Sequence, residues 1–317
     1  MDTSPLTREK SPLVGLALGG GGLRGAAHIG VLKVLQGAGI VPAFLAGTSA
    51  GSVIAGLYAA GYSPDKIASL LAGVTPGDLW DPALGRGFLL LLGLTGFLPL
   101  DATFSPRWIP HLPLGLLKGE KLEKLLLEFT RHLYFHQLQL PLAVVATDLN
   151  TGTEVIFCSP ATKEKLAPRL PGRVFITNQP LGVALRASTA IPGIFYPKKV
   201  GRRLLVDGGL KNNVPAGIVK AGGARVVLAV DLEFASQRDD RIGNFLEVML
   251  QTSDIMGQTI TDLQLAGAAH YVLYPQIYDM NLLALDKIPA AIERGAQVTA
   301  AALPKIKELI RQAQLLP

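Results

Sequence analysis

The sequence contains a single cysteine, Cys158, in 317 residues. One cysteine excludes an intrachain disulfide bond and a cysteine-rich metal site, and this fits a reducing compartment. We therefore predict a cytoplasmic protein that holds no metal and no cofactor. Cys158 itself is interpreted as a small apolar residue of a strand.

Long apolar runs are also scarce. The run "LVGLAL", which begins at Leu13, ends after six residues at a glycine cluster, so it does not predict an export signal. The run "GFLLLLGLTGFLPL", Gly87–Leu100, is uncharged for 14 residues, fewer than the roughly 20 that cross a bilayer. Its glycines and Pro99 also disfavour a continuous helix. We interpret it as a buried segment, or as a flap that touches a membrane peripherally.

Concentrated charge of one sign is missing as well, although the formal net charge is +6. The largest basic cluster is "PKKVGRR", which includes Lys198 and Arg203. The preferred interpretation of this cluster is a solvated loop, and the second interpretation is a contact with lipid headgroups. No aromatic residues alternate with these charges, so no nucleic-acid partner is expected. The oligomeric state stays open.

Acidic residues are absent from Ser11 to Pro64. This gap decides how to interpret "GGGGLRG", Gly19–Gly25, which contains the pattern G-x-G-x-x-G. A dinucleotide-binding fold needs an acidic residue about 20 positions further on to hold the ribose. A dinucleotide-binding oxidoreductase is therefore disfavoured, and the lack of G-x-x-x-x-G-K-[ST] excludes a phosphate-loop NTPase.

Apolar residues make up 49% of the chain, and apolar strand-like runs alternate with helical stretches. This pattern predicts an α/β fold of three layers, α/β/α, around a mostly parallel central sheet. We expect a flexible tail over residues 1–11 and a single domain over 12–315, with a cap insertion at about 75–119. Two further helices are predicted at 120–135 and 290–315. The first is amphipathic, and its apolar face contains Leu122, Leu125, Leu126 and Phe129.

The motif "GTSAG", Gly47–Gly51, lies between an apolar strand and a helix of small residues. It matches G-x-S-x-G, a sharp turn that lifts one serine hydroxyl clear of the backbone. Gly47 and Gly51 allow the strand and the helix to approach closely around that turn. Ser49 is therefore the candidate nucleophile.

A serine that attacks a carbonyl needs hydrogen-bond donors for the oxyanion that forms. Consecutive glycines can turn backbone N–H groups inward, and the helix that follows adds its positive N-terminal end. We expect Gly21 and Gly22 to be the donors, and Arg24 to steady the loop or the polar head of the substrate. The candidate oxyanion hole comprises Gly20, Gly21, Gly22, Leu23, Arg24 and Gly25.

Three aspartates follow apolar strand runs, where the catalytic groups of open α/β sheets collect: Asp148, Asp207 and Asp231. Asp207 is the candidate base because Gly208 and Gly209 leave its carboxylate room to meet another loop. Asp148 and Asp231 are interpreted as turn or cap residues.

Histidine is the usual base, so each histidine has to be weighed. His28 is interpreted as a packing or capping residue. Only His270 follows Asp207, as a Ser-Asp-His order requires. The simpler interpretation is a dyad of Ser49 and Asp207. The other three histidines are His111 in the cap region and His132 and His136 at the amphipathic helix.

The motifs "GGGGLRG", "GTSAG" and "DGG", in this order and at these spacings, resemble the patatin-like phospholipase family. The stretches "ATDLNTG" and "LRASTAIPGIF" support the resemblance, which is strong over residues 14–232 and weak in the cap and the C-terminal third. It implies a patatin-like lipid acyl hydrolase with a Ser49–Asp207 dyad and an oxyanion hole at Gly20–Gly25. The substrate class stays open, and the alternative is a non-catalytic lipid-binding or acyl-group-binding protein.

An aspartate with an ordinary pKa of about 3.9 is a weak base for a hydroxyl, so the site has to raise that pKa or stabilise the oxyanion strongly. Without a catalytic histidine, the plot of rate against pH is expected to lack the rise at about pH 6.5 that reports titration of an imidazole.

Overall fold

The computed structural model describes residues 13–83, 114–232, 245–277, 280 and 285–315. The predicted tail at 1–11 lies outside the described residues, as do Gly87–Leu100, His111 and most of the predicted cap.

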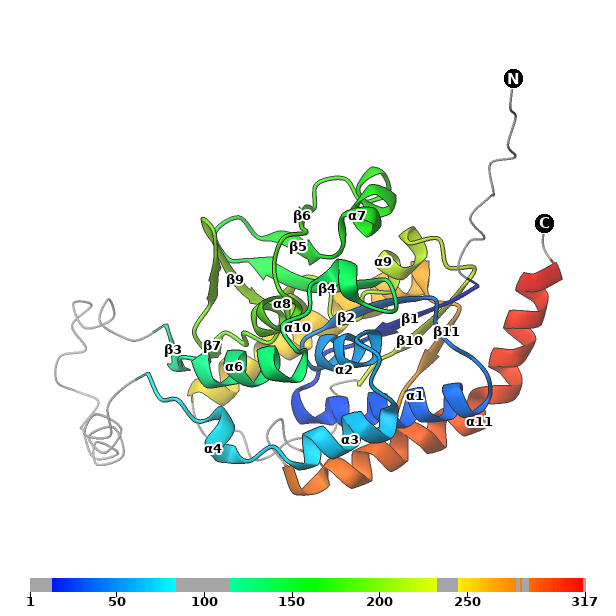
Figure 1. Ribbon diagram of the computed structural model, residues 1–317, viewed down its shortest axis with the longest axis horizontal. Helices are drawn as coiled ribbons and strands as arrows, with labels where there is room; N and C mark the ends of the chain where they lie inside the picture. Colours follow the sequence, from blue (N-terminus) through cyan, green and yellow to red (C-terminus); the bar gives the residue numbers. More distant parts are fainter. Residues whose placement is uncertain (1–12, 84–113, 233–244, 278–279, 281–284, 316–317) are drawn as a thin grey trace.

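A nine-stranded, mostly parallel sheet forms the centre of the molecule (Figure 1). Its main order is β11-β10-β1-β2-β4-β5-β6, and β9 pairs with both β4 and β8. Only the pairs β4–β5, β4–β9 and β8–β9 are antiparallel. The strands are β1 (Val14–Leu18), β2 (Phe44–Thr48), β4 (Leu142–Asp148), β5 (Thr153–Phe157), β6 (Val174–Ile176), β8 (Lys198–Val200), β9 (Arg203–Asp207), β10 (Val226–Val230) and β11 (Tyr271–Leu273).

Helices cover both faces of the sheet because its central strands are apolar on both sides. Leu16 and Leu18 of β1 face one core cluster, and Ala17 between them faces the other. The first cluster is covered by α1 (Ala27–Gly37), α2 (Ala50–Ala59), α3 (Pro64–Ala72), α8 (Leu181–Ser188) and α11 (Ile288–Leu315). The second is covered by α7 (Pro160–Leu166), α9 (Ala216–Ala221) and α10 (Phe245–Ala268). The predicted three-layer α/β/α class with a mostly parallel sheet is confirmed.

A small second sheet and two short helices lie beside the first face. The two-stranded parallel sheet joins β3 (Gly115–Leu117) to β7 (Gly193–Phe195). Nearby are α4 (Pro76–Leu79) and α6 (Glu120–Phe129). The short 3-10 helices are η1 (Gly22–Ala26), η3 (Phe135–Gln137), η4 (Ala167–Arg169), η5 (Gly208–Leu210) and η6 (Leu285–Lys287).

Two predictions of local structure were wrong. The helix predicted at 120–135 ends at Phe129, because Arg131 and His132 adopt positive φ angles of 50° and 56° that a right-handed helix does not allow. The segment "PKKVGRR" contains β8 and the turn into β9 rather than a loop, although Lys199, Gly201 and Arg202 are exposed. Two of its basic residues are paired, because Lys198 binds Glu123 and Arg203 binds Asp148.

Candidate active site

Ser49 forms the turn between β2 and α2. Its backbone has φ 51° and ψ −126°, a strained conformation for a residue with a side chain. The surrounding chain is packed too closely to relax: a Cβ on Gly51 would clash with the carbonyl of Leu18, and a Cβ on Gly47 would lie 2.6 Å from the Ser52 Cα. The predicted sharp turn from strand to helix is therefore present at "GTSAG".

Ser49 and Asp207 meet because two strands approach each other along the same side of β4. The last residue of β2, Thr48, pairs with Val145, and the last residue of β9, Asp207, pairs with the next residue of β4, Ala146. β2 is parallel to β4 and β9 is antiparallel to it, so the two strand ends point toward each other. Asp207 thus lies at the end of a strand, where it was predicted to follow one, but that strand runs opposite to β2.

Burial makes Asp207 a stronger base than an exposed aspartate. Its side chain is 7% exposed, and this burial raises its pKa from 3.8 to about 6. Hydrogen bonds from the Ser49 side chain and from the Gly209 N–H, at 2.8 Å, lower the pKa and only partly offset the effect of burial. The carboxylate is therefore in contact with the Ser49 hydroxyl and is ionised mainly above pH 6.

The glycine loop lies next to Ser49 and leads into η1. The Gly20 N–H is engaged by the backbone and side-chain oxygens of Asn213, both at 3.2 Å. Within the part of the chain that the structure describes, the N–H groups of Gly21 and Gly22 have no acceptor. Gly22 has φ 58°, which favours glycine, and it lines the same cavity as Ser49. The geometry is consistent with Gly21 and Gly22 as donors and argues against Gly20.

The other three members of the predicted loop have different surroundings. Leu23 and Gly25 line the cavity. Arg24 is buried and donates from Nε to the Gly21 carbonyl at 3.2 Å. Burial lowers the pKa of Arg24, while the nearby Asp254 and Asp231 favour its charged form. This contact matches the expectation that Arg24 steadies the loop.

The end of α8 contacts both Ser49 and Asp207. Ser188 is fully buried, accepts a hydrogen bond from the Ser49 N–H at 2.8 Å and donates to the Val145 carbonyl at 2.6 Å. Two residues on, the Ala190 carbonyl accepts from the Asp207 N–H at 3.0 Å. This role of Ser188 was not predicted from the sequence, where the only signal is that "LRASTAIPGIF" supports the family resemblance.

None of the four histidines that the structure describes has a hydrogen bond to Ser49 or Asp207. His28 is buried and its Nε2 lies 2.8 Å from the Gly19 carbonyl; burial lowers the pKa of His28 to about 4, so it is neutral and holds the loop. His270 immediately precedes β11, whereas Ser49 immediately follows β2. Because β11 and β2 are parallel, the two residues lie at opposite ends of the strands. Its Nδ1 accepts from the Val227 N–H. His132 and His136 are exposed and lie outside the cavity lining.

The remaining polar candidates have structural partners. Asp148 pairs with Arg203 and accepts from the Asn150 N–H at 3.1 Å, as a turn residue does. Asp231 follows β10 and accepts from Gln258 at 3.3 Å. Cys158 is fully buried, and burial raises the pKa of its thiol to about 12. The predicted burial of Cys158 is therefore present, but the predicted strand position is wrong by one residue, because β5 ends at Phe157.

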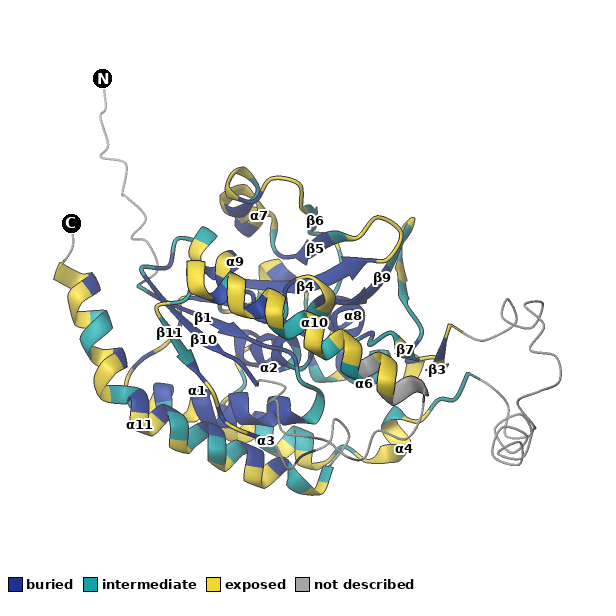
Figure 2. Ribbon diagram, turned by 180° about the vertical axis from the view of Figure 1, so that it is seen from behind, coloured by how far each residue is buried: buried dark blue, intermediate teal, exposed yellow. Residues whose placement is uncertain are grey.

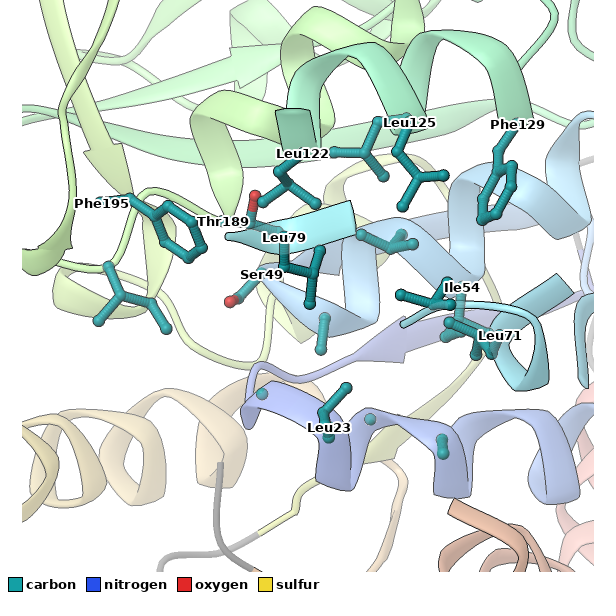
Figure 3. A pocket seen from close by; sticks show the side chains of 18 of the residues that line it. Leu23, Ser49, Ile54, Leu71, Leu79, Leu122, Leu125, Phe129, Thr189 and Phe195 are labelled. Carbon is teal, nitrogen blue, oxygen red and sulfur yellow. The ribbon is translucent and has the colours of Figure 1, made fainter. Parts of the chain in front are cut away.

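An apolar cavity extends from Ser49 between α2, α3 and α6 (Figure 3). Its empty volume, including the open mouth, is about 1050 Å³. Ser49 lies toward one end, and Leu71 and Phe129 lie toward the other. Among the described residues, Ser49 and Thr189 are the only polar side chains of the lining. The predicted apolar face of α6 belongs to this cavity, through Leu122, Leu125, Leu126 and Phe129.

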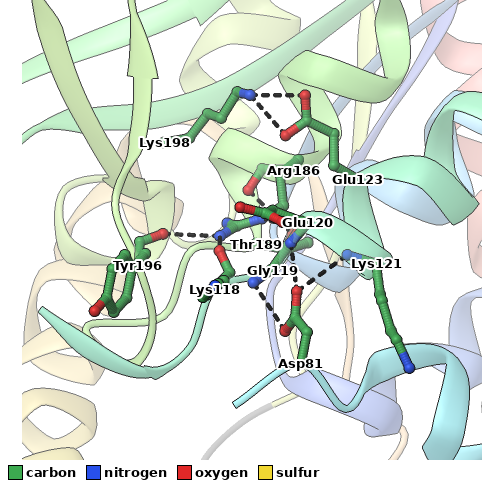
Figure 4. A network of polar contacts seen from close by, with 10 residues as sticks. All are labelled: Asp81, Lys118, Gly119, Glu120, Lys121, Glu123, Arg186, Thr189, Tyr196 and Lys198. Atoms are coloured by element: carbon green, nitrogen blue, oxygen red, sulfur yellow. Dashed lines mark hydrogen bonds and ion pairs between the residues drawn. The ribbon is translucent and has the colours of Figure 1, made fainter. Parts of the chain in front are cut away.

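A polar network holds the first turn of α6 over the cavity (Figure 4). The Asp81 carboxylate accepts from the N–H groups of Gly119, Glu120 and Lys121 at 2.6–3.1 Å, which satisfies the orphan donors of the helix. The buried Arg186 guanidinium donates to the carbonyls of Gly119 and Tyr196, each at 2.8 Å. The cavity wall is therefore anchored to α8, the helix that also holds Ser49.

Within the described ranges, no three or more His, Cys, Asp or Glu side chains are grouped so as to hold a metal ion. No described helix has both the length and the apolar character needed to cross a membrane.

The mostly parallel sheet covered on both faces, with a strained serine at the turn from β2 to α2, defines an α/β protein with a turn of the nucleophile-elbow type. The chain belongs to the patatin-like phospholipase family, whose model matches residues 16–220. The recognition made from the three motifs is confirmed.

Several known proteins are similar to this chain. An uncharacterized NTE family protein of Mycobacterium tuberculosis is 33% identical over 224 residues, which are 71% of this chain and 50% of that protein. Neuropathy target esterase sws of Drosophila melanogaster is 29% identical over 235 residues, 73% of this chain and 14% of that protein. The structure of VipD from Legionella pneumophila resembles the fold with a TM-score of 0.50 and 16% identity, covering 96% of this chain and 67% of VipD. This chain spans about half the length of the first curated relatives that it matches.

Proposed function

We propose that this chain is a serine hydrolase of lipid carboxylic esters, with Ser49 as nucleophile and Asp207 as base. The observation that supports the proposal is the contact between the Ser49 hydroxyl and the buried Asp207 carboxylate beside an apolar cavity. Family membership supports the same function, and so does the printed name of the Drosophila relative, an esterase.

The proposed reaction has two steps that share one proton acceptor. In the first, Asp207 takes the Ser49 proton as Oγ attacks the ester carbonyl, and protonated Asp207 returns the proton to the departing alcohol. In the second, Asp207 takes a proton from water, which attacks the acyl-enzyme; the fatty acid leaves and Ser49 regains its proton. A pKa of about 6 makes Asp207 a better match to neutral pH than an ordinary aspartate.

The raised pKa changes one expectation drawn from the sequence. A rate that depends on ionised Asp207 should rise with pH through about 6. A catalytic imidazole would make the rate rise over nearly the same pH range. A rise at about pH 6 therefore does not distinguish a Ser-Asp dyad from a Ser-Asp-His triad.

The glycine loop is proposed to stabilise the negative charge that forms in both steps. The N–H groups of Gly21 and Gly22 are the donors, and the start of η1 adds positive potential. The mostly apolar lining suits an acyl chain, because burying each methylene contributes about 0.8 kcal/mol. Arg24 is buried outside the cavity lining and binds the Gly21 carbonyl, so its proposed role is to hold the loop rather than a substrate head.

Labelling with a fluorophosphonate and hydrolysis of a soluble p-nitrophenyl ester test the proposal together. Ser49→Ala should remove both labelling and hydrolysis. Asp207→Asn should keep the fold and slow both by at least a hundredfold. His270→Ala is the matched control and should retain wild-type rates.

Two outcomes contradict the proposal. Loss of hydrolysis in folded His270→Ala would restore a triad. A wild-type chain that binds fatty acid but is neither labelled nor able to hydrolyse any ester of a chain-length series would be the alternative, a lipid-binding protein.

A further inference from the structure

The loop that follows Asp207 is tied to the strand that leads to Ser49. A Cβ on Gly208 would lie 3.0 Å from the Thr48 Cγ2, so this loop rests directly on the end of β2. Further along the loop, the Asn212 carbonyl accepts from the Thr48 hydroxyl at 2.8 Å, and the Asn212 N–H donates to the Gly208 carbonyl at 2.9 Å. The main chain of Asn212 therefore joins the residue before the candidate nucleophile to the residue after the candidate base.

The side chain of Asn212 is anchored on a different strand, β5. Its Nδ2 donates to the Glu154 Oε1 at 2.8 Å, and both residues are buried. The other oxygen of the carboxylate, Glu154 Oε2, accepts from the Arg173 Nε at 2.9 Å. Since a buried carboxylate needs partners for both oxygens, Glu154 offers Asn212 an acceptor that is itself held in place.

Thr48 and Glu154 lie on the same face of the sheet, with β4 between them. Thr48 pairs with Val145, and Glu154 pairs with Thr147 two residues further along β4. Paired residues and alternate residues of a strand share a face, and two strand spacings amount to about 10 Å. Asn212 spans this gap, with its main chain at β2 and its side chain at β5. Figure 2 views the molecule from this side, where nearly all of β4 and β5 is buried.

A shift of Asn212 would reach both members of the candidate dyad. Thr48 leads into the strained turn at Ser49, and Gly208 follows Asp207, whose carboxylate contacts the Ser49 hydroxyl. A displacement of about 1 Å between reacting groups can slow a reaction by about a hundredfold. The bond from Asn212 to β5 therefore fixes the loop along a direction that the main-chain bonds leave less constrained.

We propose that Asn212 is a positioning residue of the site formed by Ser49 and Asp207, and that Glu154 holds it in place from β5. The inference rests on the proposed function, because the positioning serves the ester hydrolysis assigned to this site. Neither Asn212 nor Glu154 lines the cavity, so both act through their neighbours. They act from the opposite face of the sheet to Ser188, which binds the Ser49 N–H from α8.

Exchanging the amide and the carboxylate tests the inference with the soluble p-nitrophenyl ester at pH 8, where two facing carboxyl groups are least able to share a proton. Asn212→Asp offers no donor to Glu154, so kcat should fall about 10–100-fold while KM changes less than about twofold. Glu154→Gln keeps an acceptor for Asn212 and should retain most of the wild-type kcat. The double variant Asn212→Asp/Glu154→Gln again faces a donor with an acceptor, so its kcat should exceed that of Asn212→Asp by about fivefold or more.

Two further variants separate positioning from stability. Asn212→Ser is too short to reach Glu154 and should lower kcat over the same range, which keeps the test in place if Asn212→Asp does not fold. Thr162→Val is the matched control, because Thr162 is 4% exposed and its hydroxyl accepts from Ser159 at 2.9 Å in α7. The control should lose stability in urea unfolding and keep the wild-type kcat.

Two results overturn this inference alone: a wild-type kcat in the folded variants of Asn212, or a double variant no faster than Asn212→Asp. Either result is obtained with a wild-type chain that hydrolyses the ester, so the proposed function survives it. A wild-type chain that hydrolyses no ester overturns the proposed function and this inference with it.

Discussion

Asp207 and His28 are both buried, and burial shifts their pKa values in opposite directions. Removing charge from water favours the neutral form, so the pKa of Asp207 rises to about 6 and that of His28 falls to about 4. At neutral pH the site therefore contains an ionised carboxylate with a raised proton affinity and an uncharged imidazole. The Asp207 carboxylate is suited to act as a base, and the His28 imidazole is suited to donate a hydrogen bond to the Gly19 carbonyl.

Asp207→Asn should stabilise the fold at pH 8. A group whose pKa is raised in the folded state contributes stability below its unfolded pKa of 3.8, and this contribution is lost as pH rises through about 6. Since the asparagine stays neutral, the variant should exceed the wild type by about 3 kcal/mol in free energy of unfolding at pH 8. Below pH 3.8 the difference should vanish. Urea unfolding at both pH values measures it, and a less stable variant at pH 8 would contradict the burial of the charge.

At the scale of elements, the end of α8 sets the position of Ser49 relative to Asp207. Ser188 holds the Ser49 backbone and Ala190 holds the Asp207 backbone, and only Thr189 lies between them. Ser188 also binds Val145, the residue of β4 that pairs with Thr48. A short, rigid helix end thus spans the junction between β2 and β9.

Ser188→Ala should slow catalysis more than it weakens substrate binding. It leaves the Ser49 N–H without its acceptor and lets the strained turn relax, which displaces Oγ. We expect kcat for a soluble ester to fall about 10–100-fold with KM changed less than about twofold.

Thr299→Ala is the matched control, because Thr299 is equally buried and its hydroxyl donates to the Gly295 carbonyl at 2.7 Å, within α11. Both variants should lose about 1–2 kcal/mol of stability, and only Ser188→Ala should lose kcat. Equal kcat values in the two variants would refute the positioning role.

At the scale of the whole molecule, two helices far apart in the sequence, α1 and α11, pack against each other. α11 lies along α1 (Figure 1), and two glycines allow the close approach. A Cβ on Gly30 would clash with the Ile292 carbonyl, and a Cβ on Gly295 would clash with the Ala27 carbonyl. α11 also contributes Ile288 to the cavity lining. The C-terminal helix therefore supports both the helix after the glycine loop and the cavity itself.

Gly295→Ala should destabilise the protein, because the clash is with backbone that cannot move without separating α1 from α11. We expect a loss of about 2–3 kcal/mol. Gly217→Ala, in α9, meets no atom within 4 Å and should gain about 0.5–1 kcal/mol from helix propensity. Urea unfolding of the two variants makes the comparison. Similar stability of both would contradict the close packing of α1 and α11.

The sequence by itself determined the local parts of this protein. The α/β class followed from alternating apolar runs and helices, and the sharp turn at Ser49 and the glycine loop followed from motifs of five to seven residues. Such motifs are predictable because glycine content and backbone conformation are settled among neighbours in the chain. The choice of Asp207 among three aspartates rested on the same local signal, its two following glycines.

Only the tertiary structure decided how those parts meet. The antiparallel course of β9, the burial that raises the pKa of Asp207 and the contact of Ser188 with Ser49 all depend on residues far apart in the chain. The exposure of Ile255, Met256 and Leu263 on α10 does too, because helical periodicity defines a face without saying which side the core takes. Strand pairing and desolvation are long-range, since they depend on which segments become neighbours on folding. No pattern within a short window of residues contains that information.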